Sequence, residues 1–237
     1  MAMTVIAATS LRTRASHALD LRAVLVLLTC ATGLIDAASY LGMGHVLVAN
    51  MTGNVVFLGF ALAGTAGFSL AAFAVALGSF LVGAGLGGRL GIALSGRRRC
   101  WLITAAVAQT ALAGAATITA AGAGLGAGGV ARLVVIALLA VGMGVQTATV
   151  RRLAVPDLTT TVLTMTLTGL AADSSAAGGN NPRLTRRITA VAATLIGAVI
   201  GAVLVLHAGV VATLAVLTAV YAMAGVGFAV LDEQAAQ

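Results

Sequence analysis

Residues 188–231 read ITAVAATLIGAVIGAVLVLHAGVVATLAVLTAVYAMAGVGFAVL and contain no Asp, Glu, Lys or Arg. This stretch is long enough for two helical passes through a bilayer, because one pass needs about 20 apolar residues. The rest of the chain has the same character: hydrophobic residues are 60% of the 237 and charged residues only 8%. A water-soluble domain carries about a quarter charged residues to solvate its outside. The sequence therefore predicts an all-α protein that crosses a membrane several times.

Six stretches of the chain are long and apolar enough to cross as helices. Two further stretches are ambiguous. The stretch 46–64 is uncharged but holds three polar side chains close together, and 157–172 is rich in threonine. Each could cross fully, or could enter and leave on the same side. The six predicted spans are 23–43, 68–88, 101–121, 133–150, 188–208 and 209–231.

The arginines decide between these two topologies, because loops on the cytoplasmic side of a membrane carry an excess of basic residues. All 13 basic residues are arginine. If both ambiguous stretches cross, the arginines of 89–99 and 151–152 fall outside. If neither crosses, every arginine except Arg132 lies in the cytoplasm. We therefore predict six transmembrane helices plus two half-penetrating (re-entrant) helical segments, with both termini cytoplasmic and 1–22 as an N-terminal tail.

Simple dimensions agree with half-penetration for the stretch 46–64. An extended chain from residue 46 to 50 covers about 13–16 Å at roughly 3.3 Å per residue, close to the bilayer midplane at about 15 Å. A helix from 50 to 64 then rises about 22 Å, which is enough to leave again. Non-helical backbone at that depth is tolerated only where it is buried in protein or lines a water-filled cavity. A site at the centre of the membrane is therefore expected.

Comparison of the chain with itself predicts an internal repeat. Residues 48–56 align with 155–163, and 33–37 align with 144–148. Each half then comprises a span, a re-entrant segment and two more spans. Because three spans is an odd number, the second half enters the membrane upside down, an architecture used by transporters. The two inverted three-span repeats are 23–122 and 130–231, within a single integral membrane domain.

Small residues also recur at equivalent places in the two halves. Gly83 and Gly87 follow the first ambiguous stretch, and Gly197 and Gly201 follow the second. Glycines four residues apart let two membrane helices approach closely. These faces predict tight packing inside the chain, and they equally allow a homo-oligomer.

Asp36 is the one acidic residue inside a predicted span, where an ionised carboxylate is costly unless it faces a cavity or a partner. The alternative is a hydrogen-bonded Asp that fixes helix contacts, through Ser39 or Thr32. Asn50 and Asp157 stand where each half-helix begins and are favoured N-caps. A sharper hypothesis is that both half-helices point their N-termini at one central site. The predicted substrate-binding residues are Asp36, Asn50, Thr52, Asn54, Gln146, Asp157, Thr159 and Thr161.

Several blocks of this sequence resemble the YoaK-like family of bacterial multi-pass membrane proteins. They are residues 33–40 (GLIDAASY), 50–54 (NMTGN), 144–146 (GVQ) leading to 151–152 (RR), and 157–164 (DLTTTVLT). The resemblance extends over nearly the whole chain. It implies a bacterial plasma (inner) membrane location and no particular substrate.

The central site and the inverted repeat favour a small-solute permease or channel, with the single deep acid suited to proton coupling. The alternative is a non-transporting structural or assembly membrane protein whose polar segments only pack helices. With three dispersed histidines and no pairing of a nucleophile with a base, the sequence does not predict an enzyme, a cofactor or a metal site. The expected partners are the lipid bilayer and a small polar or anionic solute. No nucleic-acid partner is expected, since the net charge of +7 lies in connectors between spans.

Overall fold

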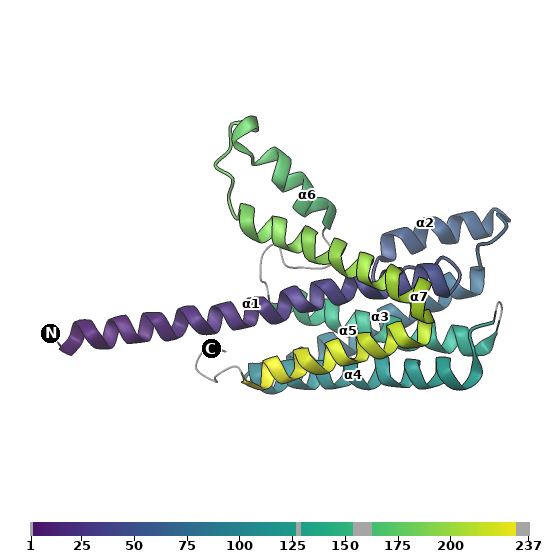
Figure 1. Cartoon of the computed structure of the whole chain (residues 1–237), viewed down its shortest axis with the longest axis horizontal. Coiled ribbons are helices and arrows are strands. Elements are labelled where there is room, and N and C mark those ends of the chain that lie inside the picture. Colours follow the sequence, from purple (N-terminus) through teal and green to yellow (C-terminus); the bar gives the residue numbers. More distant parts are fainter. Residues whose placement is uncertain (1, 127–128, 154–162, 231–237) are drawn as a thin grey trace.

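The computed structural model describes residues 2–126, 129–153 and 163–230, with side chains from residue 21 onward. Within these ranges the regular structure is helical (Figure 1). The elements in chain order are α1 (Ala2–Gly42), α2 (Met51–Leu62), α3 (Leu70–Ala93), α4 (Arg98–Ala123), α5 (Val130–Leu153), α6 (Leu163–Ala172), the 3-10 turn η1 (Ser175–Ala177) and α7 (Leu184–Val230).

Five of the described helices are long and apolar enough to cross a membrane: α1 from Leu21 onward, α3, α4, α5 and α7. Helix α7 contains both 188–208 and 209–231, which the sequence analysis treats as separate spans. Gly209 interrupts it with φ 82° and ψ 170°, a conformation that glycine adopts readily. At this point the chain folds back on itself (Figure 1). The arms 184–208 and 210–230 are about 37 Å and about 31 Å long, enough for one crossing each.

The first ambiguous stretch forms the short helix α2. Its 12 residues extend about 18 Å, well short of the hydrocarbon thickness of about 30 Å. Asn50 is its N-cap, as predicted, and Gly64 follows its end with φ +82°. In Figure 1, α2 begins beside the long helices and ends at the end of the molecule where α1 stops and α3 starts. The second ambiguous stretch contains α6, whereas residues 157–162 lie outside the described residues.

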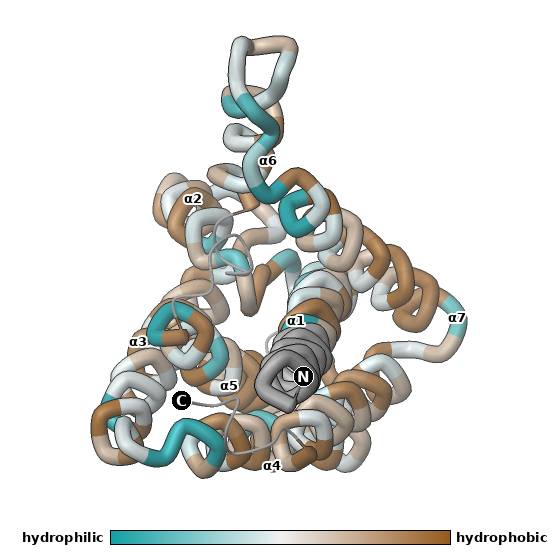
Figure 2. The backbone as a smooth tube through the Cα atoms, turned by 90° about the vertical axis from the view of Figure 1, so that its left-hand side faces the viewer, coloured by the Kyte–Doolittle hydropathy of each residue, from teal (hydrophilic) through white to brown (hydrophobic). Residues whose placement is uncertain are grey.

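Helices α1 and α5 occupy the centre of the bundle. In the spanning window of each, 61% of residues are buried, against 22–33% in α3, α4 and α7. Helix α1 packs mainly on α7, and α5 packs on α3 and α4. The hydropathy colouring in Figure 2 shows apolar residues along the outer helices as well as along the central ones. Large exposed apolar side chains such as Leu81, Ile118 and Leu195 make the outer surface suitable for contact with lipid.

Helices α1 and α7 touch backbone to backbone through two glycines. A Cβ atom placed on Gly33 of α1 would overlap the carbonyl oxygen of Thr194 in α7. A Cβ atom on Gly197 of α7 would overlap the carbonyl oxygen of Cys30 in α1. Each glycine therefore creates the space that the other helix fills.

Helices α3 and α5 meet in the same way. A Cβ atom on Gly83 of α3 would overlap the carbonyl oxygen of Val141, and one on Gly144 of α5 would overlap that of Phe80. In all four cases the overlapped carbonyl lies three residues before the glycine of the facing helix. The tight packing predicted from the glycine faces is thus present inside one chain.

This packing predicts a position-specific effect of adding one methyl group to α3. We expect Gly83→Ala to destabilise the protein by about 1–3 kcal/mol, because the new methyl group meets backbone that cannot move aside cheaply. Gly85→Ala on the same helix is the control, since a Cβ atom there meets nothing within 4 Å. The apparent Tm of the detergent-purified variants measures the difference. Equal Tm values for the two variants would contradict the close α3–α5 contact.

Candidate functional site

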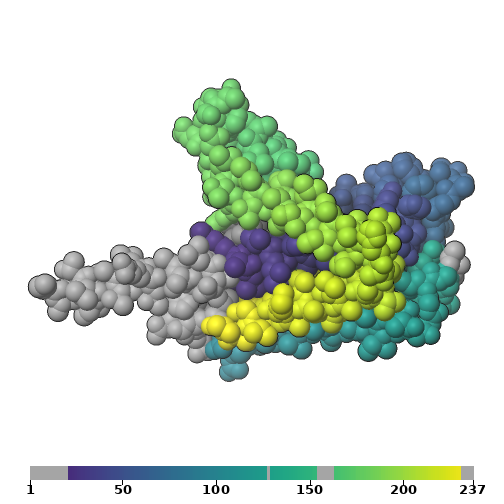
Figure 3. All heavy atoms as spheres, in the orientation of Figure 1, coloured from purple at the N-terminus to yellow at the C-terminus, as the bar shows by residue number. Residues whose placement is uncertain are grey.

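A cavity of about 850 Å³ lies between α1, the start of α2, α3, α5, the start of α6 and the first arm of α7. Figure 3 shows α2 and the α6–α7 segment side by side on the same face of the molecule. The polar lining consists of Thr32, Asp36, Asn50, Thr52, Thr147, Arg151, Thr164 and Thr194, and the remaining lining of Ala49, Met51, Gly53, Val56, Phe57, Phe80 and Leu163.

Asp36 is half-buried on α1, and its carboxylate oxygen Oδ1 accepts a hydrogen bond from the backbone N–H of Ala49 at 2.8 Å. Ala49 belongs to the non-helical segment that leads into α2. Ser39 and Thr32, the partners suggested for this carboxylate by the sequence, instead donate hydrogen bonds to backbone carbonyl oxygens. Ser39 Oγ donates to the carbonyl oxygen of Asp36 at 3.2 Å, and Thr32 Oγ1 donates to that of Leu28 at 2.9 Å. Asp36 therefore both faces the cavity and holds the segment before α2.

The first turn of α2 forms one wall of the cavity, from Asn50 to Gly53. Asn50 and Thr52 are exposed, and the Asn50 side chain accepts from the N–H of Gly53 at 3.4 Å. The first backbone N–H groups of a helix carry partial positive charge. The cavity thus faces a helix N-terminus on one side and a carboxylate on another.

Asn54 has a different position from its neighbours Asn50 and Thr52. It is fully buried at 0% exposure, outside the cavity lining. Its Nδ2 donates to the carbonyl oxygen of Leu47 at 2.6 Å, and its Oδ1 accepts from the N–H of the same residue at 2.9 Å. The geometry assigns Asn54 to holding the segment before α2.

Gln146 on α5 lies behind the cavity wall with 1% exposure. Its Nε2 donates to Thr32 Oγ1 at 3.3 Å and to the carbonyl oxygen of Leu28 at 3.5 Å, which links α5 to α1. Its Oε1 is buried without a protein partner among the described residues. The next residue, Thr147, lines the cavity and also has a buried hydroxyl oxygen without a described partner.

An aromatic cluster holds α2 against the start of α3. The ring of Phe57 lies 5.5 Å from that of Phe68 and 5.9 Å from that of Phe73, measured between centroids. It also lies 6.3 Å from the ring of Tyr40 on α1. Aromatic pairs at these distances are stabilising beyond the area that they bury. The cluster keeps the first turn of α2 at the cavity.

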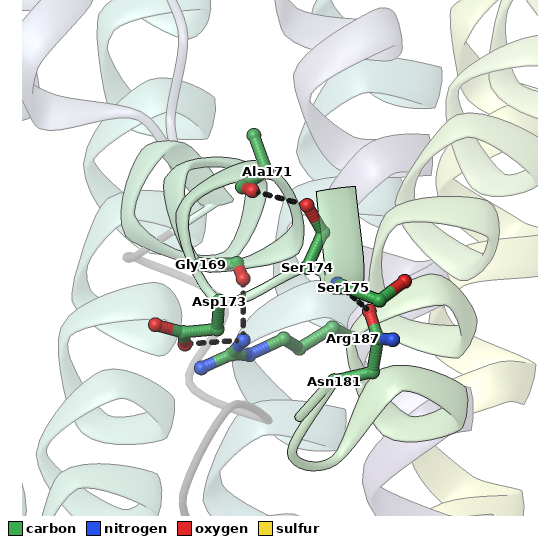
Figure 4. Close-up of polar contacts among 7 residues, drawn as sticks. All are labelled: Gly169, Ala171, Asp173, Ser174, Ser175, Asn181 and Arg187. Atoms are coloured by element: carbon green, nitrogen blue, oxygen red, sulfur yellow. Dashed lines mark hydrogen bonds and ion pairs between the residues drawn. The ribbon is translucent and has the colours of Figure 1, made fainter. Parts of the chain in front are cut away.

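Helix α6 is tied to the beginning of α7 by Arg187 (Figure 4). The Arg187 Nη1 atom donates to the carbonyl oxygen of Gly169 at 2.6 Å and lies 2.7 Å from Asp173 Oδ2. Asn181 adds a bond from its backbone N–H to the carbonyl oxygen of Asp173 at 2.9 Å. These contacts secure the end of α6, whose start contributes Leu163 and Thr164 to the cavity.

Comparison with known proteins places this chain in a family. The family described as "Protein of unknown function (DUF1275)" matches residues 24–227, nearly the whole chain. The chain belongs to this family. It is also 34% identical over 157 residues to the UPF0700 transmembrane protein YoaK of Bacillus subtilis (strain 168), covering 65% of this chain and 68% of that protein. No solved structure matches.

The predicted resemblance to YoaK-like proteins is therefore confirmed, and the chain is an integral membrane protein. Its apolar outer helices lie in contact with the lipid bilayer. The family description and the name of the relative mention no substrate. The role proposed below is therefore inferred from the cavity of this chain.

The structure brings together only part of the predicted site. Asp36, Asn50 and Thr52 line one cavity, whereas Asn54 and Gln146 lie behind its walls. The predicted residues Asp157, Thr159 and Thr161 lie outside the described residues. Five polar lining residues are absent from the predicted site. Thr147 is one of them, and its alignment with Asp36 in the internal repeat was a signal that could have identified it. The other four are Thr32, Arg151, Thr164 and Thr194.

The contrast between the two asparagines of α2 predicts an order of stability. We expect Asn54→Ala to cost about 2–4 kcal/mol, because it leaves the partly buried N–H and carbonyl of Leu47 without their partner. Asn50→Ala removes one long cap bond at an exposed position and should cost about 1 kcal/mol or less. Thermal unfolding of both variants in detergent tests this order. A larger loss for Asn50→Ala would show that Asn54 does not hold the segment.

Proposed function

We propose that this protein is a permease or channel for a small polar or anionic solute, with its binding site in the cavity around Asp36. The observation that carries the proposal is that both halves of the chain line this cavity at equivalent positions. In the internal alignment, Asp36 corresponds to Thr147 and Val56 corresponds to Leu163, and all four residues are in the lining. A site between two repeats is where many transporters bind their substrates.

The proposal includes two inverted repeats, and the helix contacts support them. Gly33 aligns with Gly144, and the spacing of Gly83 and Gly87 matches that of Gly197 and Gly201. The second span of each half packs on the first span of the other half through these glycines. Phe80 and Thr194, each three residues before such a glycine, both line the cavity. This reciprocal packing is expected if a pseudo-two-fold axis relates the halves.

We further propose that 46–64 and 157–172 are re-entrant segments. The length of α2, about 18 Å, supports this for the first segment, as does the position of its first turn at the cavity. Arginines collect where α4 begins and α5 ends, whereas Arg132 lies beside Gly44 at the other end of the bundle. Under the positive-inside rule this distribution supports cytoplasmic termini. The similarity to a transmembrane protein of Bacillus subtilis supports a bacterial plasma membrane as the location.

The chemistry of the cavity suits a small solute with polar groups. A volume of about 850 Å³ is within the range of about 300–1,000 Å³ of small-molecule sites. The start of α2 offers N–H groups with partial positive charge, and the threonine hydroxyls of the lining can both donate and accept. The Asp36 carboxylate can exchange a proton with the cavity, the step needed for proton coupling.

The competing role is a structural or assembly membrane protein without transport. The bond between Asp36 and the N–H of Ala49 favours it, because this bond alone gives the acid a reason to be present. The two roles differ in whether the charge of Asp36 matters beyond this bond.

Asp36→Asn separates the two roles. Asparagine keeps an oxygen that can accept from Ala49, so we expect the variant to fold with a Tm close to that of the unchanged protein. If Asp36 serves transport, the variant loses flux. Asp20→Asn is the matched control, since Asp20 precedes the membrane-spanning stretch of α1, which begins at Leu21.

The measurement uses proteoliposomes, with stopped-flow light scattering for uptake of a panel of small neutral and anionic solutes and an entrapped dye for pH. We expect solute flux in the unchanged protein and in Asp20→Asn, and loss of flux in Asp36→Asn. Equal flux in the unchanged protein and both variants would count against a role of Asp36 in transport. Absence of flux for every solute, with the unchanged protein folded, would count against transport altogether.

Cysteine labelling tests the proposed topology of α2. In a background with Cys30→Ala and Cys100→Ser, His45→Cys and Thr65→Cys place one thiol on each side of the segment. We expect an impermeant maleimide to label both from the same side of the membrane. Ser95→Cys, beyond α3, is the control and should react from the opposite side. Labelling of positions 45 and 65 from opposite sides would show that α2 crosses.

A further inference from the structure

A second cavity, of about 630 Å³, lies at the end of the bundle where α3 gives way to α4 and where α5 ends. It shares no described lining residue with the cavity around Asp36. Its described lining contains four arginines and no carboxylate. The lining consists of Gly91, Ser95, Gly96, Arg97, Arg98, Arg99, Cys100, Trp101, Arg152 and Leu153.

Positive charge in this cavity comes from the arginine side chains and from a helix terminus. Helix α4 starts at Arg98, and its N-cap Arg97 makes no side-chain cap bond. An uncapped helix N-terminus presents backbone N–H groups and partial positive charge to an anion. Arg99 is held in place by donating from Nη2 to the carbonyl oxygen of Ala229 at the end of α7. Its Nε is buried without a described partner.

Trp101 provides an independent sign that an acceptor is missing. The residue is 5% exposed, and its indole Nε1 has no hydrogen-bond partner among the described residues. A Cβ atom on Gly91 would lie 3.3 Å from Trp101 Cε2 and 3.2 Å from Arg152 Nε, so the indole edge and the Arg152 side chain converge beside Gly91. A buried N–H donor without an acceptor is unfavourable. An anion with several oxygen atoms, bound in the cavity, would supply acceptors for the indole N–H of Trp101 and for the guanidinium of Arg152.

We propose that this cavity binds a phosphate group, supplied by the headgroup of an anionic phospholipid or by a free phosphate compound. Arginine recognises phosphate with paired N–H donors, and basic pockets at the cytoplasmic ends of membrane helices bind anionic lipid headgroups. The cavity lies at the ends of α3, α4 and α5, which is the depth of the headgroups when these helices span the bilayer. Bound phosphate would link the α3–α4 connection to the end of α5.

The chain carries its own reporter for this binding, because Trp101 is its one tryptophan. We would titrate the full-length protein in detergent with dioctanoyl phosphatidylglycerol and follow tryptophan fluorescence. Dioctanoyl phosphatidylcholine controls for the acyl chains, and inorganic phosphate tests for the free anion. A saturable change with phosphatidylglycerol that exceeds the change with phosphatidylcholine supports the lipid source. A saturable change with inorganic phosphate at comparable concentration supports the free source.

Variants assign the binding to this cavity. Arg98→Gln combined with Arg152→Gln should weaken binding roughly fivefold for each arginine removed. Arg22→Gln combined with Arg89→Gln is the matched control, because it removes the same charge near the same end outside the cavity. Trp101→Phe keeps the ring packing and removes the N–H, and a thermal shift with added ligand should show its weaker binding.

Three results would overturn the proposal. One is a tryptophan signal that neither phosphatidylglycerol nor inorganic phosphate changes. A second is equal loss of binding in both double variants, which would reflect general charge attraction. The third concerns the acidic residues after α7. Asp232→Asn combined with Glu233→Gln should bind at least as tightly as the unchanged chain, because it removes negative charges that follow the end of α7 in sequence. A loss of binding in that variant would also contradict the proposal.

Discussion

The non-helical segment before α2 is largely buried, with Val46, Val48 and Ala49 in the core, and its polar backbone groups need partners within the protein. The N–H groups of Leu47, Val48 and Ala49 are not part of a helix, and Val48 and Ala49 are buried away from water. Three side chains provide the acceptors: Asn54 for Leu47, Ser39 for Val48 and Asp36 for Ala49. The polar side chains in this otherwise apolar region thus serve first as hydrogen-bond acceptors for backbone N–H groups. Their arrangement then leaves α2 with its first turn facing the cavity.

The walls of the cavity depend on how closely the long helices approach. Glycines at the α1–α7 and α3–α5 contacts bring backbones together without an intervening side chain. Van der Waals contact of this kind drives helix association in a membrane, where apolar side chains gain little by leaving lipid. Two of the four residues that stand three positions before these glycines, Phe80 and Thr194, are also lining residues of the cavity. Packing and the proposed site therefore share one set of contacts.

Two of the polar groupings in the described part of the chain line separate cavities. One surrounds Asp36 and joins elements from both halves of the sequence. The other gathers arginines around the start of α4 and the end of α5. In the first system donors and acceptors are mixed, which suits a solute with several polar groups. In the second, the described side chains are mainly donors, which suits an anion. These are different physical environments, so a ligand of one would not serve the other.

The sequence alone determined that the protein is helical and crosses a membrane, because composition and the length of the apolar runs are sufficient for this. It also located the N-cap of α2 at Asn50, since capping depends on neighbouring residues only. Tertiary structure decided which polar side chains face the cavity. Successive residues on a helix point about 100° apart, so Gln146 turns toward α1 while Thr147 reaches the lining. That difference depends on the rotation of α5 against its neighbours, which packing contacts set and which no local pattern in the sequence encodes.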